Sequence, residues 1–226
     1  MVVVAGDSTV LSTPSGDLRG DIEGGIGVWR GVPYAEQPIG QRRFAAAEPL
    51  IPWTGVRDAT EHGPLPPQAK SFVGGGRDDP KARDEACLTL TVWSPDTTAS
   101  LPVMVWIHGG GFVSGRKEDL GNYARILAGH GFAVASIDYT LAPTARWPGP
   151  TRQANAALRW LRAQAPAMLA MESESPLLVD AHASASRPLS GARPRPDAVA
   201  MSATRSAIAV AEPDSHPSPI PMHGSP

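Results

Sequence analysis

Two predicted buried strands joined by a helical segment constrain the fold of this chain more than any other feature. Residues 103–107 are apolar without interruption, as in a strand covered on both faces, and residues 132–137 are predicted to form the next strand. Residues 119–128 between them have the apolar period of a helix, whose buried face is expected to carry Leu120, Tyr123, Ile126 and Leu127. This order predicts a parallel, right-handed unit, which a second helix at about 153–164 continues. The predicted class is α/β with a parallel sheet and flanking helices.

The residues before this unit are predicted to contain antiparallel strands and a long connection. The first 30 residues alternate short apolar runs with turn signals, a pattern that is typical of small hairpins. Residues 31–86 are rich in Pro and Gly and have no helical period, so we expect an irregular connection there. The alternation in residues 87–93 predicts a half-buried strand with Leu88, Leu90 and Val92 on its apolar face.

Composition divides the chain near residue 165. Every aromatic residue lies at or before Trp160, whereas residues 163–226 contain 14 Ala, 10 Pro and 10 Ser. A segment of this kind buries too little apolar surface to offset the entropy lost on ordering. We therefore expect one folded domain at 1–164 and a disordered, low-complexity tail at 165–226.

Charge and cysteine content exclude several classes of function. The formal net charge is −2, so no basic surface points to nucleic acid. Cys87 is the only cysteine, which excludes an intrachain disulfide and any metal site built from several cysteines. The N-terminus has no basic leader before an apolar stretch, and no run approaches 18 apolar residues. We expect a cytoplasmic protein with neither signal peptide nor membrane span.

The motif with the clearest chemistry is His108-Gly109-Gly110-Gly111-Phe112, which directly follows the strand at 103–107. Glycines at the carboxyl end of a parallel strand let backbone N–H groups face a cleft, where paired donors can stabilise an oxyanion. An HGGG loop at this position is the oxyanion motif of lipases and esterases with the α/β-hydrolase fold. The alternative is an ordinary tight turn, which is our interpretation of Gly74-Gly75-Gly76. The preceding strand and the following helix favour the oxyanion loop for 109–111.

Further motifs occur in a consistent order along the first 115 residues. They are Thr13-Pro14-Ser15-Gly16, Arg30-Gly31-Val32-Pro33-Tyr34-Ala35, Pro38-Ile39-Gly40, Arg43-Phe44, Trp53, Asp58-Ala59-Thr60, Gly63-Pro64, Cys87-Leu88-Thr89-Leu90-Thr91-Val92-Trp93 and the segment 101–115. In these motifs the chain resembles the type-B carboxylesterases. Between residues 136 and 161 it also resembles the hormone-sensitive-lipase-like esterases, through Ser136-Ile137-Asp138-Tyr139, Leu141-Ala142-Pro143 and Ala156-Ala157-Leu158-Arg159-Trp160-Leu161. Both groups are serine ester hydrolases, so the resemblance implies an incomplete α/β-hydrolase fold, in which antiparallel hairpins lead into the parallel sheet.

The resemblance also implies roles for individual residues. The backbone amides of Gly110 and Gly111 would be the oxyanion donors, and His108 would support the loop, with a solvent-facing or core histidine as the alternative. Cys87 matches a family position that often pairs with an earlier cysteine near residue 66, which is absent here, so a small buried residue on a strand is expected. The departure of Asp84-Glu85-Ala86 from the usual acidic pair puts a local salt bridge in doubt.

The nucleophile that such chemistry needs is missing from its usual motif. Ester hydrolysis by this fold uses a serine in G-x-S-x-G, and the chain contains no such sequence. The spacing in lipase-like relatives places the elbow at 177–186, where Ser184 is a very weak candidate that could be combined with Asp197 and His216. Serine is so frequent in this segment that chance explains the order. We expect the family pattern to stop near Gln164, through a reading-frame change or, alternatively, truncation or splicing.

The sequence therefore predicts a carboxylic ester hydrolase by family resemblance, acting through a serine acyl-enzyme without cofactor or metal, but inactive as this isolated chain. The expected partner of an active form is a small-molecule carboxylic ester. An unpaired edge on the last strand predicts self-association. One alternative is a non-catalytic binding or interaction module that keeps the hydrolase cleft. Another is a fragment without independent function.

Overall fold

One mixed sheet organises the part of the chain that can be described. The structure is a computed structural model, and it describes residues 3–5, 8–68, 83–99, 101–168 and 177–181. Its elements in chain order are β1 (Val3–Ala5), β2 (Ser8–Thr13), β3 (Gly16–Glu23), β4 (Ile26–Pro33), η1 (Gly40–Arg42), β5 (Val56–Asp58), β6 (Thr89–Ser94), β7 (Val103–Ile107), η3 (Lys117–Leu120), α1 (Gly121–Gly129), β8 (Ala133–Ile137), α2 (Gly149–Met168) and β9 (Leu177–Ala181). The strands follow the order β1-β2-β3-β4-β6-β8-β7-β9, and β5 pairs with β3 outside this path.

The N-terminal half of the sheet is antiparallel, as predicted. Strands β1 to β4 pair in succession as hairpins. The turn between β3 and β4 uses Gly24 and Gly25, whose φ angles are +59° and +83°, values that glycine adopts without strain. The expected irregular connection is interrupted by η1 and by β5, which pairs in parallel with β3. Strand β5 could not be predicted from apolar alternation, because all three of its residues are exposed.

The C-terminal half is the predicted parallel unit. Strand β8 lies between β6 and β7, antiparallel to the first and parallel to the second, and β9 pairs in parallel with the other side of β7. Ile107 at the end of β7 is opposite Ile137 of β8 and Ala181 of β9. The three parallel strands therefore end at one edge of the sheet, where the HGGG loop begins. This arrangement, with the carboxylesterase-like hairpins before it, is the amino-terminal part of an α/β-hydrolase fold.

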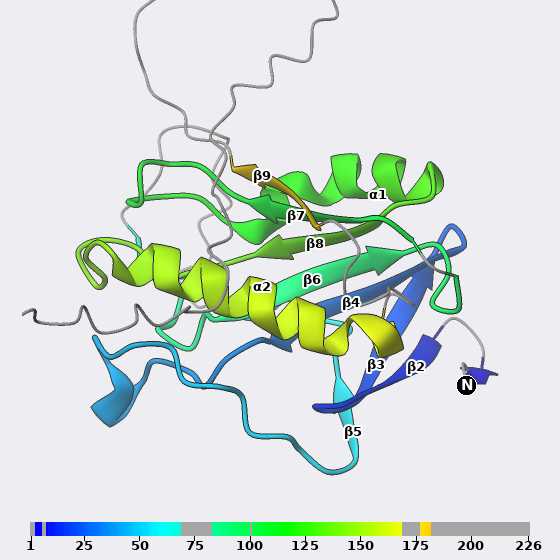
Figure 1. Ribbon diagram of the computed structural model, residues 1–226, viewed down its shortest axis with the longest axis horizontal. Coiled ribbons are helices and arrows are strands. Elements are labelled where there is room, and N and C mark those ends of the chain that lie inside the picture. Colours follow the sequence, from blue (N-terminus) through cyan, green and yellow to red (C-terminus); the bar gives the residue numbers. More distant parts are fainter. Residues whose placement is uncertain (1–2, 6–7, 69–82, 100, 169–176, 182–226) are drawn as a thin grey trace, which may run out of the picture. The chain divides into compact units, whose positions relative to one another are not determined.

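Two helices cover opposite faces of the sheet (Figure 1). Helix α2 packs on the larger core, where Leu158 and Leu161 meet side chains of β6, β7 and β8. Helix α1 packs on a smaller core with Val28, Trp93 and Val134. Here the predicted helical face is wrong in part, because Tyr123 and Ile126 are exposed. Ala124 and Ala128 are buried against the sheet instead, together with Leu120. Alanine at these positions lets the helix approach the sheet closely, which a stripe of large residues would prevent.

Strand β6 is more buried than its alternating sequence suggests. All six of its residues are buried, whereas the alternation predicts a strand with one exposed face. The strand lies between β4 and β8, and its threonine face is covered as well, because the Thr91 hydroxyl meets His62 Nδ1 at 3.1 Å. An alternating sequence therefore does not distinguish a threonine that faces solvent from a buried threonine with a polar partner.

The end of the described structure differs from the predicted domain boundary. Helix α2 runs to Met168 and not to Gln164, and β9 lies within the segment expected to be a disordered tail. Residues 169–176 and 182–226 lie outside the described part, and so does the prediction of disorder for them. Strand β9 is the last in the path, with no further strand beside it among the described residues.

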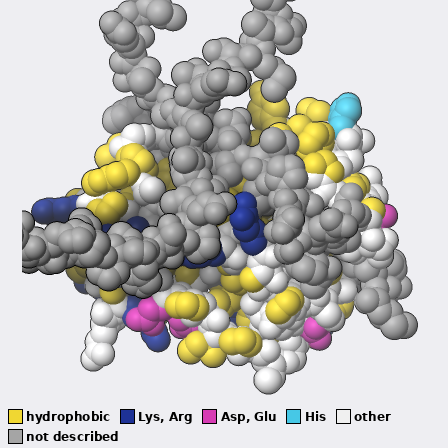
Figure 2. Space-filling view, viewed as in Figure 1, with side chains coloured by type: hydrophobic (Ala, Val, Ile, Leu, Met, Phe, Trp, Pro, Cys, Tyr) yellow, Lys and Arg dark blue, Asp and Glu magenta, His cyan; other side chains and the backbone are white. Residues whose placement is uncertain are grey.

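The surface of this part carries exposed apolar and basic side chains. Within the described residues, no helix is long and apolar enough to cross a membrane. Large hydrophobic side chains are nevertheless exposed, including Phe44, Trp147 and Phe112. In the view of Figure 2, Lys and Arg side chains lie among hydrophobic ones near the middle of the face shown.

Candidate functional site

The loop after β7 has a backbone that only glycine can form at its centre. The φ angles of Gly110 and Gly111 are +114° and +61°, both in the region that disfavours side chains. A Cβ built on Gly110 would lie 1.9 Å from the carbonyl oxygen of Ser114, so no other residue fits there. A Cβ on Gly111 would meet nothing within 4 Å, because this glycine projects into open space. The loop therefore requires glycine at position 110 by contact and conformation. At Gly111 only the positive φ disfavours a side chain, and Phe112 has a similar φ of +62°.

The same loop leaves the four successive backbone amides of residues 109–112 without an acceptor among the described residues, and those of Gly110 and Gly111 are two of them. The carbonyl oxygen of Gly110 accepts hydrogen bonds from the amides of Val113 and Ser114, at 3.1 and 3.2 Å, and these bonds close the turn. The amides of Gly110 and Gly111 themselves donate to no acceptor among the described residues. Gly110 is partly buried and Gly111 is exposed, so these two successive amides at the mouth of a strand are available to water or to a ligand.

His108 lies beneath the loop and is buried, which contradicts the solvent-facing alternative. Its ring stacks on Tyr139 with a centroid separation of 4.3 Å, and its Nδ1 lies 2.9 Å from the carbonyl oxygen of Gly109. The Tyr139 hydroxyl donates to the His108 carbonyl oxygen at 2.6 Å. Burial raises the pKa of Tyr139, so this phenol keeps the proton that it donates. These contacts join the first residue of the loop to the segment after β8, and a buried histidine is also what the core alternative predicts.

A buried ion pair holds the segment that follows the loop. Lys117 and Asp138 are both fully buried, and Lys117 Nζ lies 2.5 Å from Asp138 Oδ2. The Lys117 amide donates to the other carboxylate oxygen at 2.7 Å, and the Ser136 hydroxyl donates to the Lys117 carbonyl at 2.8 Å. Burial alone would lower the pKa of Lys117, but attraction to Asp138 and Glu118 outweighs it and raises this pKa. The pair ties the far end of the loop to the end of β8.

Gln68 closes the loop from the side. Its Oε1 accepts from the Gly115 amide and its Nε2 donates to the Gly115 carbonyl, each at 3.0 Å. Gly115 has a φ of +119°, and a Cβ there would lie 2.3 Å from His108 Nδ1. Sequence reasoning missed Gln68, Lys117 and Asp138. Only Asp138 had a signal, because a carboxylate directly after a buried strand needs a partner.

Two predictions near residue 87 have different outcomes. Cys87 is buried as expected, although it precedes β6 and does not lie on a strand, and burial raises the pKa of its thiol to about 12. It is therefore an unreactive thiol at neutral pH. The doubt about a local salt bridge was wrong, because Glu85 Oε2 lies 2.6 Å from Arg43 Nε.

The position predicted for the nucleophile elbow coincides in part with a strand. The expected segment 177–186 begins with β9, which ends at Ala181 opposite the last residue of β7. The two strands thus end side by side at the edge where the loop begins. Ser184, Asp197 and His216 lie outside the described residues, so no geometry relates them to Gly110 and Gly111.

Comparison with known proteins gives two overlapping family matches. Residues 7–145 match the carboxylesterase family, and residues 104–194 match a family with the alpha/beta hydrolase fold. The second match extends past Gln164, where the family pattern was expected to stop. The family pattern therefore continues past Gln164, contrary to the expectation, and β9 lies within the matched region.

Curated relatives and solved structures give the same family. The chain is 48% identical over 141 residues to phenmedipham hydrolase from Pseudarthrobacter oxydans and 38% identical over 136 residues to para-nitrobenzyl esterase from Bacillus subtilis, in each case over 59% of this chain. A thermophilic para-nitrobenzyl esterase structure superposes with a TM-score of 0.69 at 32% identity, covering 77% of this chain and 38% of that one. The Geobacillus stearothermophilus carboxylesterase covers 76% of this chain and 38% of its own, with 29% identity and a TM-score of 0.64. The chain spans 28% of the length of each of the two curated relatives.

Proposed function

This chain belongs to the carboxylesterase family, and we propose that residues 108–112 form the oxyanion loop of a serine-type carboxylic ester hydrolase. The observation that carries the proposal is the pair of unpaired amides at Gly110 and Gly111, held at the carboxyl end of a parallel strand. Two preorganised N–H donors are what a tetrahedral ester intermediate needs, because negative charge develops on the former carbonyl oxygen.

The chemistry proposed for this loop is transition-state stabilisation. A base takes the proton of a serine hydroxyl as its oxygen attacks the ester carbonyl, and the electron pair moves to the carbonyl oxygen, which the two amides stabilise. The C=O bond forms again as the bond to the alcohol oxygen breaks, the alcohol leaves with that proton, and water then hydrolyses the acyl-enzyme. The donors must not move when the charge appears. The buried pair Lys117 and Asp138, the stacked pair His108 and Tyr139, and the two hydrogen bonds from Gln68 support this requirement, because they fix the loop on three sides. The reaction uses no cofactor or metal.

The proposed substrate class is a small carboxylic ester. The resemblance to a para-nitrobenzyl esterase supports this class, although the chain spans only 28% of that enzyme.

We also propose that this chain by itself does not hydrolyse esters. The reason is the absence of G-x-S-x-G from all 226 residues, since Ser184 has no glycine two positions to either side. An oxyanion loop without a nucleophile gives only weak rate enhancement. A reading-frame change in the coding DNA would explain the missing motif. In that case another frame should encode a Gly-Asp-Ser-Ala-Gly-like elbow near the codons for β9.

Activity-based labelling of the full chain tests the proposal. A fluorophosphonate probe reacts only with an activated serine, and turnover of p-nitrophenyl acetate reports catalysis. We expect no labelling and no saturable turnover above a serine-free control protein. Labelling of a peptide containing Ser184, lost together with turnover in Ser184→Ala, would contradict the proposed inactivity and assign a nucleophile.

A further inference from the structure

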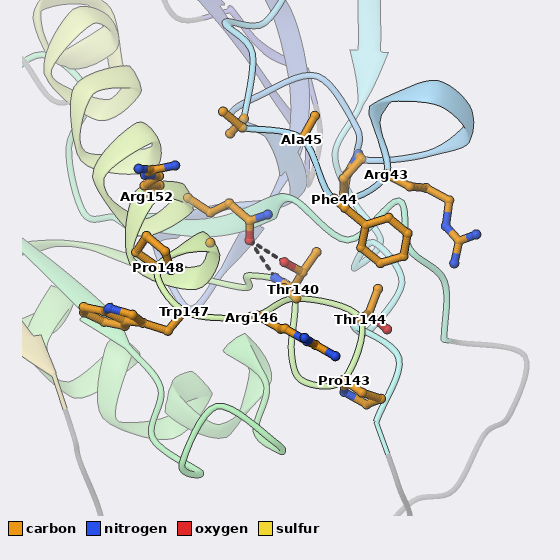
Figure 3. Close-up of a pocket in the computed structure, with 16 residues that line it drawn as sticks. Arg43, Phe44, Ala45, Thr140, Pro143, Thr144, Arg146, Trp147, Pro148 and Arg152 are labelled. Carbon is orange, nitrogen blue, oxygen red and sulfur yellow. Dashed lines mark hydrogen bonds between the residues drawn. The ribbon is translucent and has the colours of Figure 1, made fainter.

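A cavity lies beside the proposed oxyanion loop, between the segment 38–47 and the start of α2. Its volume is about 590 Å³. Figure 3 shows Arg152 on the helix and Thr144 and Arg146 on the loop before it, with Phe44 on the facing segment. We call this cavity the arginine pocket. Neither Gly110 nor Gly111 lines it, so it is a separate site.

The described residues do not balance the charge of the arginine pocket. Arg146 and Arg152 line it, and no ion pair joins either of them to an acidic group among the described residues. Arg43 also lines the pocket, but its guanidinium pairs with Glu85. The described lining contains no Asp or Glu, and the first turn of α2 has no acidic residue that would offset its helix dipole. The pocket is therefore cationic.

A buried amide adds a fixed donor. Gln153 is 5% exposed and lines the pocket, and its Oε1 accepts hydrogen bonds from the amide and the hydroxyl of Thr140, both at 2.8 Å. A backbone N–H can only donate, so these bonds fix which end of the side chain is oxygen. The Nε2 group then donates to no acceptor among the described residues. Gln153 Nε2 is not one of the solvent-inaccessible atoms that lack a partner, so this donor can be reached by an acceptor of a ligand in the cavity.

The remaining walls are apolar. They are formed by Phe44, Pro143, Trp147, Pro148 and the alanines at 45–47. Phe44 and Trp147 are 75% and 73% exposed, which is unusual for aromatic side chains of this size unless something covers them. Planar guanidinium groups match the two oxygens of a carboxylate, whereas the aromatic rings suit an apolar body.

We infer that the arginine pocket binds an organic carboxylate with an aromatic or other apolar body. The carboxylate pairs with Arg146 and Arg152 and accepts from Gln153 Nε2, and the apolar body lies against Phe44 and Trp147. Binding needs no nucleophile, so the inference goes beyond the proposed esterase chemistry and does not depend on it.

Isothermal titration of the full chain with 1-naphthoate and with its neutral analogue 1-naphthamide tests the inference. We expect 1-naphthoate to bind at least tenfold more tightly, because only the carboxylate pairs with the arginines. Inorganic phosphate, which has no apolar body, should bind at least tenfold more weakly than 1-naphthoate. Equal affinity for the acid and the amide, or no binding of the acid at millimolar concentration, would overturn the inference. So would phosphate that binds as tightly as 1-naphthoate.

Single substitutions separate the two parts of the pocket. Arg152→Gln should weaken 1-naphthoate about fivefold to tenfold and leave 1-naphthamide unchanged, whereas Trp147→Ala should weaken both probes. Arg159→Gln is the matched control, since Arg159 is exposed on the same helix and does not line the pocket. An equal loss with Arg159→Gln would show that the effect is general surface charge and would overturn the inference. These arginines are exposed, so circular dichroism of each variant should match that of the parent chain.

Discussion

The oxyanion loop and the arginine pocket lie on neighbouring segments but are held in opposite ways. Beneath the loop, Lys117, Asp138 and His108 are buried and contact one another or the loop backbone, while the amides of Gly110 and Gly111 have no acceptor among the described residues. Around the pocket, Arg146 and Trp147 are exposed, and no acidic partner within the described residues neutralises Arg146 or Arg152. Interior charge thus fixes a backbone in this protein, whereas surface charge is left available to a ligand.

The two sites also differ in how rigid they must be to bind their ligands. A site that stabilises a transition state must be preorganised, because reorganisation at the moment of reaction reduces the stabilisation. A site that binds a stable anion can tolerate exposed side chains and some motion. Replacing residues beneath the loop should therefore affect folding strongly, and replacing residues of the pocket should affect only the ligand.

The largest effect on stability is expected for Lys117→Met. This change leaves Asp138 buried without its counter-charge, a situation that typically costs about 3 to 5 kcal/mol. Urea denaturation followed by circular dichroism gives the free energy of unfolding. The double variant Lys117→Met/Asp138→Leu should recover much of the loss. A loss below about 1 kcal/mol in the single variant would mean that the pair does not hold this region.

The two glycines of the loop should differ in their tolerance of a methyl group. Gly110→Ala combines a disfavoured φ with overlap on the Ser114 carbonyl, and should cost about 2 to 5 kcal/mol. Gly111→Ala has the unfavourable φ without the overlap, and should cost about 1 to 2 kcal/mol. Thermal and urea unfolding of both variants measure the difference. Equal losses would contradict the packing described for Gly110.

The contribution of the Lys117 pair should disappear in alkali. The pKa of Lys117 is raised in the folded protein, so its stabilisation is complete below the ordinary lysine value of 10.5 and is lost as pH rises through the folded value. The stability difference between the parent chain and Lys117→Met should accordingly narrow above about pH 10. Burial also raises the pKa values of Cys87 and Tyr139, but both groups are present in both proteins. A difference that stays constant to pH 12 would contradict the assignment.

The smallest effect on stability is expected at the pocket. Arg152→Gln should change the free energy of unfolding by less than about 0.5 kcal/mol, because the side chain is exposed and has no acidic partner among the described residues. A large loss would mean that Arg152 supports the fold and is not held ready for a ligand. The same urea titration used for Lys117→Met provides the measurement.

Local sequence patterns predicted much of the fold and part of the site. The hairpins, the parallel unit and the HGGG loop could be predicted because glycines, turn signals and apolar runs act on neighbouring residues. Pairings across long distances in sequence could not. Lys117 meets Asp138, and Gln68 meets Gly115, through contacts that only the folded sheet creates.

Two errors have a similar physical origin. The exposed face of α1 was predicted to be buried because large apolar residues were weighted above Ala124 and Ala128, although small residues permit the closest packing. The burial of β6 was underestimated because Thr91 satisfies its hydroxyl inside the protein. The arginine pocket had no sequence signal at all, since its residues come from segments about 100 positions apart.

The proposal that Gly110 and Gly111 supply oxyanion donors is tested most directly by placing this loop in a related esterase. Residues 107–115 of this chain replace the equivalent loop in the Bacillus subtilis para-nitrobenzyl esterase. Steady-state kinetics of this chimera on a p-nitrobenzyl ester are then measured with and without Gly111→Val. The account predicts a kcat within about tenfold of the parent for the exchanged loop, and a fall of about 10²-fold to 10³-fold in kcat with Gly111→Val, because the side chain projects into the open space before the donors. An active chimera whose kcat is unchanged by Gly111→Val would contradict the claim.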